Sequence, residues 1–523
     1  MDEDEFIVLE ENVALSQSKI WNWHQNFYLD SGVGAWHSKV PHYVTSNPFI
    51  ANAYVQVVIE FLNEHLIKNP DSIQHTFYFL ELGAGHSKFS FLFLKRFTEL
   101  RALLNPNLKF CYLITDFSEK NLNFASTHPQ LQEYIAAGVL DFACFDIEKC
   151  NSLQLRLRQT CLSQASIRNP LIVVANYILD SLRKDAFYVD ERYRLSSQLI
   201  NIKTKASNLV QGDPLNLENL LIEFSSAPVG AQHYLEQEFN HILAEYNQYV
   251  QARSFSLPVT AFRLIDYLIN LSNDRLLLIS SDKGYLTHEE FSTRTEPHIA
   301  FHGGCFSLMT NFDAIARYFK VKGGDACLQA SHPGLGSCIY ISAGKFADLP
   351  KTQLAFATHL NQFSPQDYFN LCNMMIANVK TLSLEVLNSC LNLSGYDPYV
   401  FHRLLPRLKA DVAAETSSLI SALKRAASLV TEQFYFMPGC EDIYFDVGLF
   451  FHHVKEYEQA LDYYQRSQTV FEANFNTTYN IGLCYYHLND FEQAENFFLK
   501  ALEFSPNSLE AKDWLKYVRR RLG

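Results

Sequence analysis

The stretch "YFLELGAGHSKFS", residues 78–90, decides the fold, because a hydrophobic run ends directly in a turn that holds two glycines. The turn Gly83-Ala84-Gly85 leads into "SKFSFLFLKRF", whose apolar spacing predicts a helix. A strand, a glycine turn and a helix together bring backbone close to a ligand, since glycine lacks the Cβ atom that would obstruct the approach. Glu81 stands just before the turn. We therefore expect a ligand site with a carboxylate beside it.

Short apolar runs that each end in a polar or acidic residue alternate with segments of helical length around this motif. They predict strands over residues 77–82, 109–116, 139–146, 170–176 and 275–281. Strands that alternate with helices form right-handed βαβ units and a parallel sheet covered on both faces. The predicted fold is therefore α/β with a Rossmann-like sheet, and the polar strand ends meet at the edge where ligands bind.

The rest of the chain divides by composition and pattern. Between the fourth and fifth strands we predict a largely helical insertion, at about residues 185–270, in which "FYVDERYRLSSQL" reads as a strand hairpin. The expected domains are an N-terminal helical segment over 1–76, the sheet-containing core over 77–350, a helical region over 351–437 and a repeat region over 441–523.

The C-terminal region repeats itself with the period of tetratricopeptide repeats. "EYEQALDYY" at 456–464 is echoed 34 residues later by "DFEQAENFF" at 490–498. The second copy has small and aromatic residues at the repeat positions: Ile481, Gly482, Tyr485, Ala494, Phe498, Ala501 and Pro506. Residues 509–522 predict a capping helix. Tyr444, Tyr479 and Tyr486 either anchor a partner protein or pack between the helices.

The glycine turn does not fit a dinucleotide or nucleoside triphosphate. Lys88 occupies the third glycine position of G-x-G-x-x-G, and the sequence holds no G-x-x-x-x-G-K-[ST]. An acidic residue two positions before the first glycine, here Glu81, is more typical of S-adenosylmethionine enzymes. The alternative is a plain tight turn without a ligand.

Acidic residues after the next strands favour a cofactor site over that alternative. Asp116 can accept both ribose hydroxyls in charge-assisted hydrogen bonds, and Phe117 can pack against adenine. Asp146 lies in reach of the adenine amino group, and Ile147 beside it is included among the expected contacts. Taken alone, each aspartate is more often a helix N-cap.

Two residues after the fourth strand are the candidates for catalysis. Asn176, which is also an expected cofactor contact, and Asp180 can hold a nucleophilic nitrogen and accept its proton. The alternatives are a strand-end turn residue for Asn176 and an N-cap for Asp180. His42 and His86 are expected at the surface or behind the ligand contacts. We expect no metal site.

The motifs resemble those of class I methyltransferases of the MidA type. The resemblance spans roughly residues 30–345 and includes "LELGAGHSKFS", "YLITDFSEKNL", "VVANYILDSLRKDAFYV", "YVTSNPFIANAYVQVV", "PVTAFRLIDYLINL" and "FSLMTNFDAIARYF". That family includes mitochondrial arginine methyltransferases that assist assembly of respiratory complex I. The resemblance implies S-adenosylmethionine as cofactor, held by Glu81, Gly83, Gly85, Asp116 and Asp146.

The chain departs from the family where the substrate is expected. Ser87 stands at the family's third glycine, and Tyr177 replaces the glutamate after Asn176. The family's Gly-Asp before "TS" is Pro41-His42 here, and Phe49 stands where the family has glutamate. A guanidinium needs anionic partners to hold and orient it, so these departures put arginine as substrate in doubt.

Composition narrows the functional class. The net charge of −13 argues against non-specific nucleic-acid binding. Three features favour a cytoplasmic protein without a membrane span: the acidic start "MDEDEF", the absence of a bilayer-spanning run, and 11 cysteines without a C-x-x-C pair. Signal-independent secretion is left open.

The sequence thus leads to a methyltransferase that acts on a protein side chain, arginine or another nitrogen, with the repeats docking the target or a partner. The rival hypothesis is a degenerate methyltransferase fold that serves as a repeat-based scaffold. Methylation of a small molecule is a third, less favoured, hypothesis.

Overall fold

The computed structural model describes residues 6–36, 43–208, 216–330, 334–412 and 416–523. Contacts divide the chain into two compact units, residues 1–368 and 369–523. The first unit contains the sheets, and the second is helical. The division falls inside the helical region expected over 351–437. Helix α9 (Pro350–Phe356) belongs to the first unit because Glu64 of α2 (Pro48–Lys68) accepts hydrogen bonds from Lys351 and Thr352.

The first unit is built on a mostly parallel sheet in the order β16-β17-β12-β7-β2-β3-β4. Its strands are β2 (Phe77–Glu81), β3 (Phe110–Asp116), β4 (Leu140–Cys144), β7 (Leu171–Asn176), β12 (Leu276–Tyr285), β16 (Asp325–Leu328) and β17 (Leu335–Ile341), and the short β15 (Thr310–Asn311) pairs with β12. Strand β17 is antiparallel to both its neighbours. The five predicted strands are confirmed as β2, β3, β4, β7 and β12, and the order is that of the class I methyltransferase fold.

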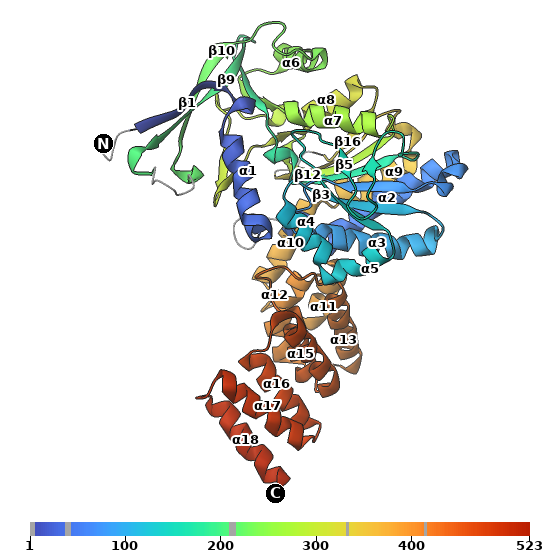
Figure 1. Ribbon diagram of the computed structural model, residues 1–523, viewed down its shortest axis with the longest axis vertical. Helices are drawn as coiled ribbons and strands as arrows, with labels where there is room; N and C mark the ends of the chain where they lie inside the picture. The colour runs from blue at the N-terminus through green and yellow to red at the C-terminus, as the bar shows by residue number, and fades with distance from the viewer. Residues whose placement is uncertain (1–5, 37–42, 209–215, 331–333, 413–415) are drawn as a thin grey trace. The chain divides into compact units, whose positions relative to one another are not determined.

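Helices cover both faces of this sheet (Figure 1). Because successive side chains of a strand point to opposite faces, Leu80 packs with α7 (Val259–Leu271) and α8 (Phe312–Val321) on one face. On the other face Phe79 packs on α3 (Lys88–Leu104), with its ring centroid 4.9 Å from that of Phe97. A sheet buried on both sides explains why its strands read as continuous apolar runs.

A second, antiparallel sheet carries the N-terminal strand and most of the insertion. It consists of β1 (Phe6–Ala14), β8 (Asp185–Val189), β9 (Leu195–Lys205), β10 (Leu221–Pro228) and β11 (Arg253–Leu257). The prediction of a largely helical insertion was wrong, since strands β8 to β11 make up much of it, beside α6 (Gln237–Tyr249) and nearly all of α7. The prediction that residues 1–76 are helical is likewise wrong for residues 6–14, which pair with β9.

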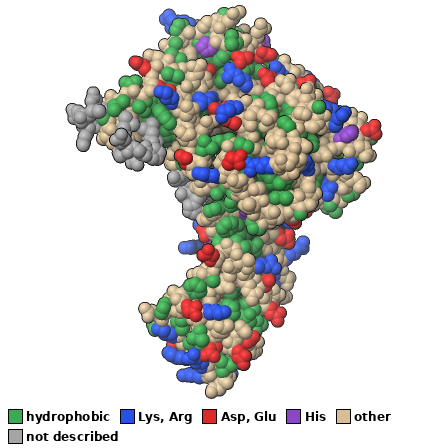
Figure 2. Space-filling model, in the orientation of Figure 1, with side chains coloured by type: hydrophobic (Ala, Val, Ile, Leu, Met, Phe, Trp, Pro, Cys, Tyr) green, Lys and Arg blue, Asp and Glu red, His purple; other side chains and the backbone are tan. Residues whose placement is uncertain are grey.

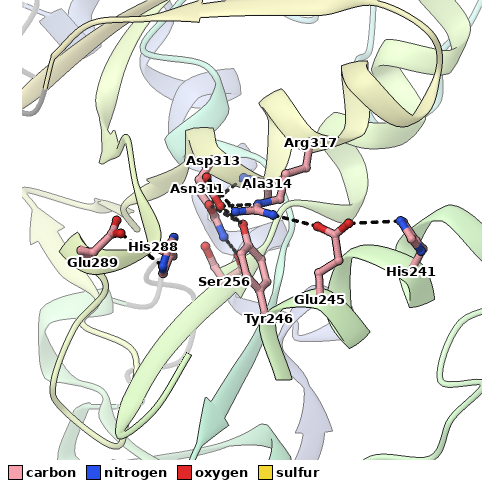
Figure 3. A network of polar contacts seen from close by, with 10 residues as sticks. All are labelled: His241, Glu245, Tyr246, Ser256, His288, Glu289, Asn311, Asp313, Ala314 and Arg317. Carbon is pink, nitrogen blue, oxygen red and sulfur yellow. Dashed lines mark hydrogen bonds and ion pairs between the residues drawn. The ribbon is translucent and has the colours of Figure 1, made fainter. Parts of the chain in front are cut away.

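A polar network fastens the insertion to the sheet-containing core (Figure 3). Arg317 of α8 forms ion pairs with Asp313, at 2.7 Å, and with Glu245 of α6, at 2.8 Å. The hydroxyl of Tyr246, also on α6, donates to Asp313 at 2.7 Å. Asn311 donates to the carbonyl of Ser256 in β11 at 2.9 Å. These bonds join α6 and β11 of the insertion to α8 of the core.

The second unit consists of paired helices. They are α11 (Leu384–Leu393), α12 (Pro398–Asp411), α13 (Ser417–Glu432), α14 (Ile443–His453), α15 (Tyr457–Phe471), α16 (Phe475–His487), α17 (Phe491–Phe504) and α18 (Leu509–Leu522), preceded by α10 (Pro365–Ala377), which crosses the boundary between the units. A Cβ atom on Gly448 would lie 2.6 Å from the ring of Tyr464, and one on Gly482 would lie 3.0 Å from Phe498. The small residues of the repeat therefore sit where paired helices touch, as predicted.

The repeat tyrosines are half-buried and take part in ring contacts. Tyr444 lies 5.3 Å from Phe434, Tyr479 lies 5.7 Å from Phe498, and Tyr486 lies 4.8 Å from Trp514, measured between ring centroids. Of the two interpretations given above, packing between helices is the one these contacts support. The last turn of α18 instead presents Arg519, Arg520 and Arg521, in a basic region visible in Figure 2.

The first repeat depends on the helices before it. His402 of α12 lies 2.6 Å from Asp446, which raises the pKa of His402, and the hydroxyl of Tyr463 donates to Ser428 of α13 at 3.2 Å. We therefore predict that a fragment of residues 441–523 is less helical and melts at lower temperature than residues 379–523, because repeats gain stability from their neighbours. Circular dichroism of both fragments tests this, and equal melting would contradict it.

Candidate functional site

One cavity lies at the carboxyl edge of the parallel sheet, and every residue predicted for the site lines it. These residues are Glu81, Gly83, Ala84, Gly85, Asp116, Phe117, Asp146, Ile147, Asn176 and Asp180. They come from the ends of four neighbouring strands or from the turns that follow them. Other parts of the wall come from α1 (Ile20–Ser31), β13 (Ala300–His302) and β14 (Cys305–Ser307), with further residues from α3 and β12.

The two glycines are required by conformation and by close neighbours. Gly83 has φ +59° and Gly85 has φ +55°, in the left-handed region that side chains rarely adopt. A Cβ atom on Gly83 would lie 2.2 Å from Cδ1 of Ile178, and one on Gly85 would lie 2.7 Å from the ring of Trp36. The turn is thus a shallow cradle in the cavity floor that any larger residue would fill.

Glu81 is buried, and both of its described hydrogen bonds go to one oxygen. Ser90 of α3 and Tyr112 of β3, the latter at 2.8 Å, donate to Oε2. Burial is the main cause that raises the pKa of Glu81 from 4.5 to about 7, and these donors oppose it. No described residue bonds to Oε1, so that oxygen is left for the cavity.

Asp116 fastens the glycine turn to the neighbouring strand. Its Oδ2 accepts from the backbone N–H of Gly85 at 2.9 Å, and its Oδ1 accepts from that of Ser118 at 2.8 Å. Burial raises the pKa of Asp116, and these backbone donors lower it in part. Each carboxylate oxygen retains a lone pair for a further donor, so a bond to a ligand hydroxyl is compatible with these contacts.

Asp146 lies two residues beyond the end of β4, and the prediction that the strand extends to it was wrong. Its Oδ1 accepts from the backbone N–H of Glu148 at 3.0 Å, and its Oδ2 pairs with Lys149 at 2.6 Å. The carboxylate therefore shapes a turn, and no helix begins there, so Asp146 is not the helix N-cap of the alternative. Phe117 and Ile147 line the same part of the cavity.

The amide oxygen of Asn176 is already occupied by donors from the protein. Its Oδ1 accepts from the hydroxyl of Tyr54 at 2.6 Å and from the backbone N–H of Ser281 at 3.2 Å. Its Nδ2 is buried and has no hydrogen-bond partner among the described residues. The prediction that Asn176 accepts a proton is therefore wrong for this geometry, since the amide offers only donors.

Asp180 is buried within a cluster of charges. Its backbone N–H donates to Asp282 at 2.9 Å, and its backbone carbonyl accepts from Lys184 at 3.0 Å. The carboxylate itself accepts from Ser181 at Oδ1. Burial raises the pKa of Asp180, and the ammonium of Lys184 opposes that shift. A base with a raised pKa retains a proton more readily once it has accepted one.

Lys184 holds two walls of the cavity together. Its buried ammonium donates to the carbonyls of Leu179, Asp180 and Leu308, at 3.0, 3.0 and 3.2 Å. The first two belong to the turn after β7, and the third follows β14. An ammonium has three donors, and here each has an acceptor.

Several cavity residues were not found from the sequence. His24 and Tyr28 come from α1, Lys283 from β12, His302 from β13 and Cys305 from β14. No motif connects these segments, which lie far apart in the chain. The signal available was weak: aromatic and histidine residues at helical spacing in "IWNWHQNFY".

Other expectations have mixed outcomes. His86 lines the cavity and is buried, with its Nδ1 accepting from the backbone N–H of Lys88 at 3.1 Å. Phe49 does not line it but stacks on Tyr368, with ring centroids 4.6 Å apart. Pro41 and His42 lie outside the described residues.

In the described ranges, no three or more His, Cys, Asp or Glu side chains are grouped so as to hold a metal ion. Among the described helices, none combines the length and apolarity needed to cross a bilayer.

Parts of this chain are similar to known proteins. A family model described as tetratricopeptide repeat matches residues 440–507. Among curated proteins, none matches this chain. A COG1565 superfamily member from Burkholderia thailandensis, bound to S-adenosyl-homocysteine, is similar at 15% identity over 56% of this chain and 66% of its own, with a TM-score of 0.36. YrrB, a tetratricopeptide protein with an unusual peptide-binding site, is similar at 16% identity over 32% of this chain and 82% of its own, with a TM-score of 0.24. The fold assignment rests on the strand order.

We predict that Gly83→Ala lowers the free energy of unfolding by more than about 1 kcal/mol, since positive φ alone costs roughly that much. The clash with Cδ1 of Ile178 adds to the cost. In an Ile178→Val background, which lacks Cδ1, the same substitution should cost less. Gly230→Ala, where nothing lies within 4 Å of an added Cβ, is the control. Chemical denaturation of the four variants measures the coupling, and additive effects would contradict the contact.

We predict that Glu81→Gln becomes more stable relative to the unmodified chain as pH rises from about 4.5 to about 7. Over that interval the unfolded chain releases the Glu81 proton while the folded chain retains it, so ionisation opposes folding. Above about pH 7 the difference should level off. Urea denaturation across this range checks the sign, and a pH-independent difference would contradict the raised pKa.

Proposed function

We propose that the first unit binds S-adenosylmethionine and transfers its methyl group to a protein. The observation that carries this proposal is the cavity at the carboxyl edge, where a sheet in class I methyltransferase order brings the glycine turn together with Glu81, Asp116 and Asp146. Ligands of doubly wound folds bind at this edge.

The residues present fit the cofactor. The glycine turn exposes backbone to the cavity without a Cβ atom, and the free oxygen of Glu81 can face the methionine end. Asp116 would accept the ribose hydroxyls, while Phe117 and Ile147 would contact the adenine. A buried carboxylate that accepts ligand hydroxyls forms charge-assisted bonds, which are stronger than neutral ones.

Methyl transfer requires the protein chiefly to align the methyl donor and the acceptor. S-adenosylmethionine supplies an activated methyl group, so the protein has to hold the acceptor in line with it and remove its proton. Asp180 is our candidate for the base because its carboxylate lies in the cavity and burial raises its pKa. Asn176 then serves as a donor that positions the reactants.

The repeats support a protein as target or partner. Tetratricopeptide repeats form extended binding surfaces, and here they occupy the C-terminal end of the chain. We therefore propose a MidA-type enzyme whose repeats dock the methylated protein or a partner of the reaction. The second candidate, a non-catalytic scaffold, is favoured by the phenylalanine at position 49, which stacks on Tyr368 and offers no carboxylate.

We predict that the full chain binds S-adenosylmethionine and S-adenosylhomocysteine in calorimetric titrations. Asp116→Ala should weaken both at least about tenfold, since charge-assisted hydrogen bonds contribute roughly 1.5–3 kcal/mol each. Asp71→Ala, which removes an exposed carboxylate outside the cavity, is the matched control. Unchanged affinity in Asp116→Ala would remove Asp116 from the site.

A measurement of methyl transfer distinguishes the enzyme hypothesis from the scaffold hypothesis. Full-length protein is incubated with S-adenosylmethionine and a cell extract, and release of S-adenosylhomocysteine is measured. The enzyme hypothesis requires release that falls in Asp180→Asn while cofactor affinity stays within a few fold. Cofactor binding without release would favour the scaffold.

A further inference from the structure

Three residues that line the cavity carry side-chain groups whose hydrogen-bonding capacity no described residue uses. These groups are the Nε2 atom of His24, the Nδ2 atom of Asn176 and the Oδ2 atom of Asp180. His24 and Asp180 have little exposed surface, and the Nδ2 atom of Asn176 is buried. A buried polar group without a partner is costly, so these groups indicate where a ligand makes its polar contacts.

His24 is a donor toward the cavity. Its Nδ1 accepts from the backbone N–H of Phe306 at 3.2 Å, and burial lowers the pKa of His24 to about 3. A neutral imidazole carries one proton. Because Nδ1 is the acceptor, that proton is on Nε2, and His24 offers an N–H group to whatever occupies the cavity.

Asn176 and Asp180 complement each other. The backbone N–H of Ser281 fixes Oδ1 of Asn176 as acceptor, which leaves two N–H donors on Nδ2. Asp180 offers the opposite character, since only Oδ1 of its carboxylate accepts a described side-chain bond, from Ser181. The cavity therefore presents donors from two residues and an acceptor from a third.

These groups meet at one end of the cavity. Asn176 and Asp180 lie four positions apart, at the end of β7 and in the turn that follows it. His24 accepts from Phe306, and the backbone N–H of Leu308 donates to the carbonyl of Asp180 at 3.4 Å. Strand β14 thus contacts His24, the residue after it contacts Asp180, and Lys184 holds Leu308 against the same turn.

Hydrogen-bonding character argues against a guanidinium as acceptor. A guanidinium carries only donors, so it has no acceptor atom to offer the N–H groups of His24 and Asn176. A carboxylate would satisfy the donors but would oppose Asp180. A primary amide has both a carbonyl oxygen and an NH₂ group, and satisfies all three.

We propose that the methyl acceptor is the uncharged primary amide of a glutamine or asparagine side chain, an inference that rests on the proposed function. The amide oxygen accepts from His24 and Asn176, and the amide nitrogen donates to Asp180. In the transfer, a bond forms between the amide nitrogen and the methyl carbon, and the sulfur–methyl bond breaks with its electron pair retained by sulfur. The nitrogen's proton passes to Asp180.

The test compares three capped amino acids that share their acetyl and methylamide groups. N-acetylglutamine methylamide, N-acetylarginine methylamide and N-acetylglutamate methylamide are titrated by NMR into full-length protein saturated with S-adenosylhomocysteine. We expect the glutamine probe to bind at least about tenfold more tightly than the other two, since an unsatisfied buried group penalises the wrong ligand. Tighter binding of either charged probe, or equal binding of all three, would overturn the proposal.

Two variants test the assigned contacts. His24→Phe keeps a ring beside Trp21 and Phe306 but removes the N–H donor, and Asp180→Asn keeps the shape of the side chain. Each should weaken the glutamine probe about tenfold and leave S-adenosylhomocysteine affinity within a few fold. His241→Gln, in the exposed end of the network in Figure 3, should change neither.

The outcomes distinguish failure of the proposed function from failure of the amide inference. If S-adenosylhomocysteine does not bind, the proposed function fails. If it binds and the glutamine probe is not preferred, or if the preference survives His24→Phe, only the amide inference fails. The unmodified chain answers the question by itself should a variant not fold. With S-adenosylmethionine in place of the product, mass spectrometry should detect one added methyl group on the side-chain nitrogen of the glutamine probe.

Discussion

The hydrogen bond from the backbone N–H of Gly85 to the carboxylate of Asp116 is the constraint on which the site depends. It ties the turn after β2 to the end of β3, so two neighbouring strands share one rigid edge. The same carboxylate accepts from Ser118 and starts the segment that leads into the next helix. A buried carboxylate needs such donors because its ionised form is costly in an apolar surrounding. The glycine turn and the acid therefore support each other, and the cavity floor follows from both.

The cavity has two ends of different character. At the end near Glu81 and Asp116, carboxylates are held by hydroxyl and backbone donors and face the space expected for the cofactor. At the end near Asp180, charges of both signs are buried together, and Lys184 uses its donors to hold the walls. Lys184 thereby fixes the turn after β7 against Leu308, which suits alignment of two reactants.

The helical unit follows a different rule, because each repeat buries its apolar face only against its neighbours. Gly448 and Gly482 allow close helix contact, and the preceding helices supply the neighbour that the first repeat lacks. The basic last turn of α18 faces the negative end of the helix dipole and suits a terminal helix. Contacts between neighbouring helices organise this unit, which explains why the sequence pattern predicts its repeats.

The sequence by itself determined the strands, the glycine turn and the repeats, because each depends on residues close together in the chain. Apolar runs mark the strands, glycines mark the turn, and a repeat period marks the paired helices. It also brought together the residues that line the cavity, since parallel strands end at one edge; their roles stay proposals. Only the tertiary structure decided the orientation of Asn176, the burial of Asp180 and the presence of His24. Tyr54 and Ser281 turn the amide of Asn176, and Phe306 sets the tautomer of His24. The antiparallel pairing of residues 6–14 with β9 also lay beyond the sequence pattern. Such contacts join segments more than about a hundred residues apart, and no local pattern encodes which partner a hydrogen bond will find.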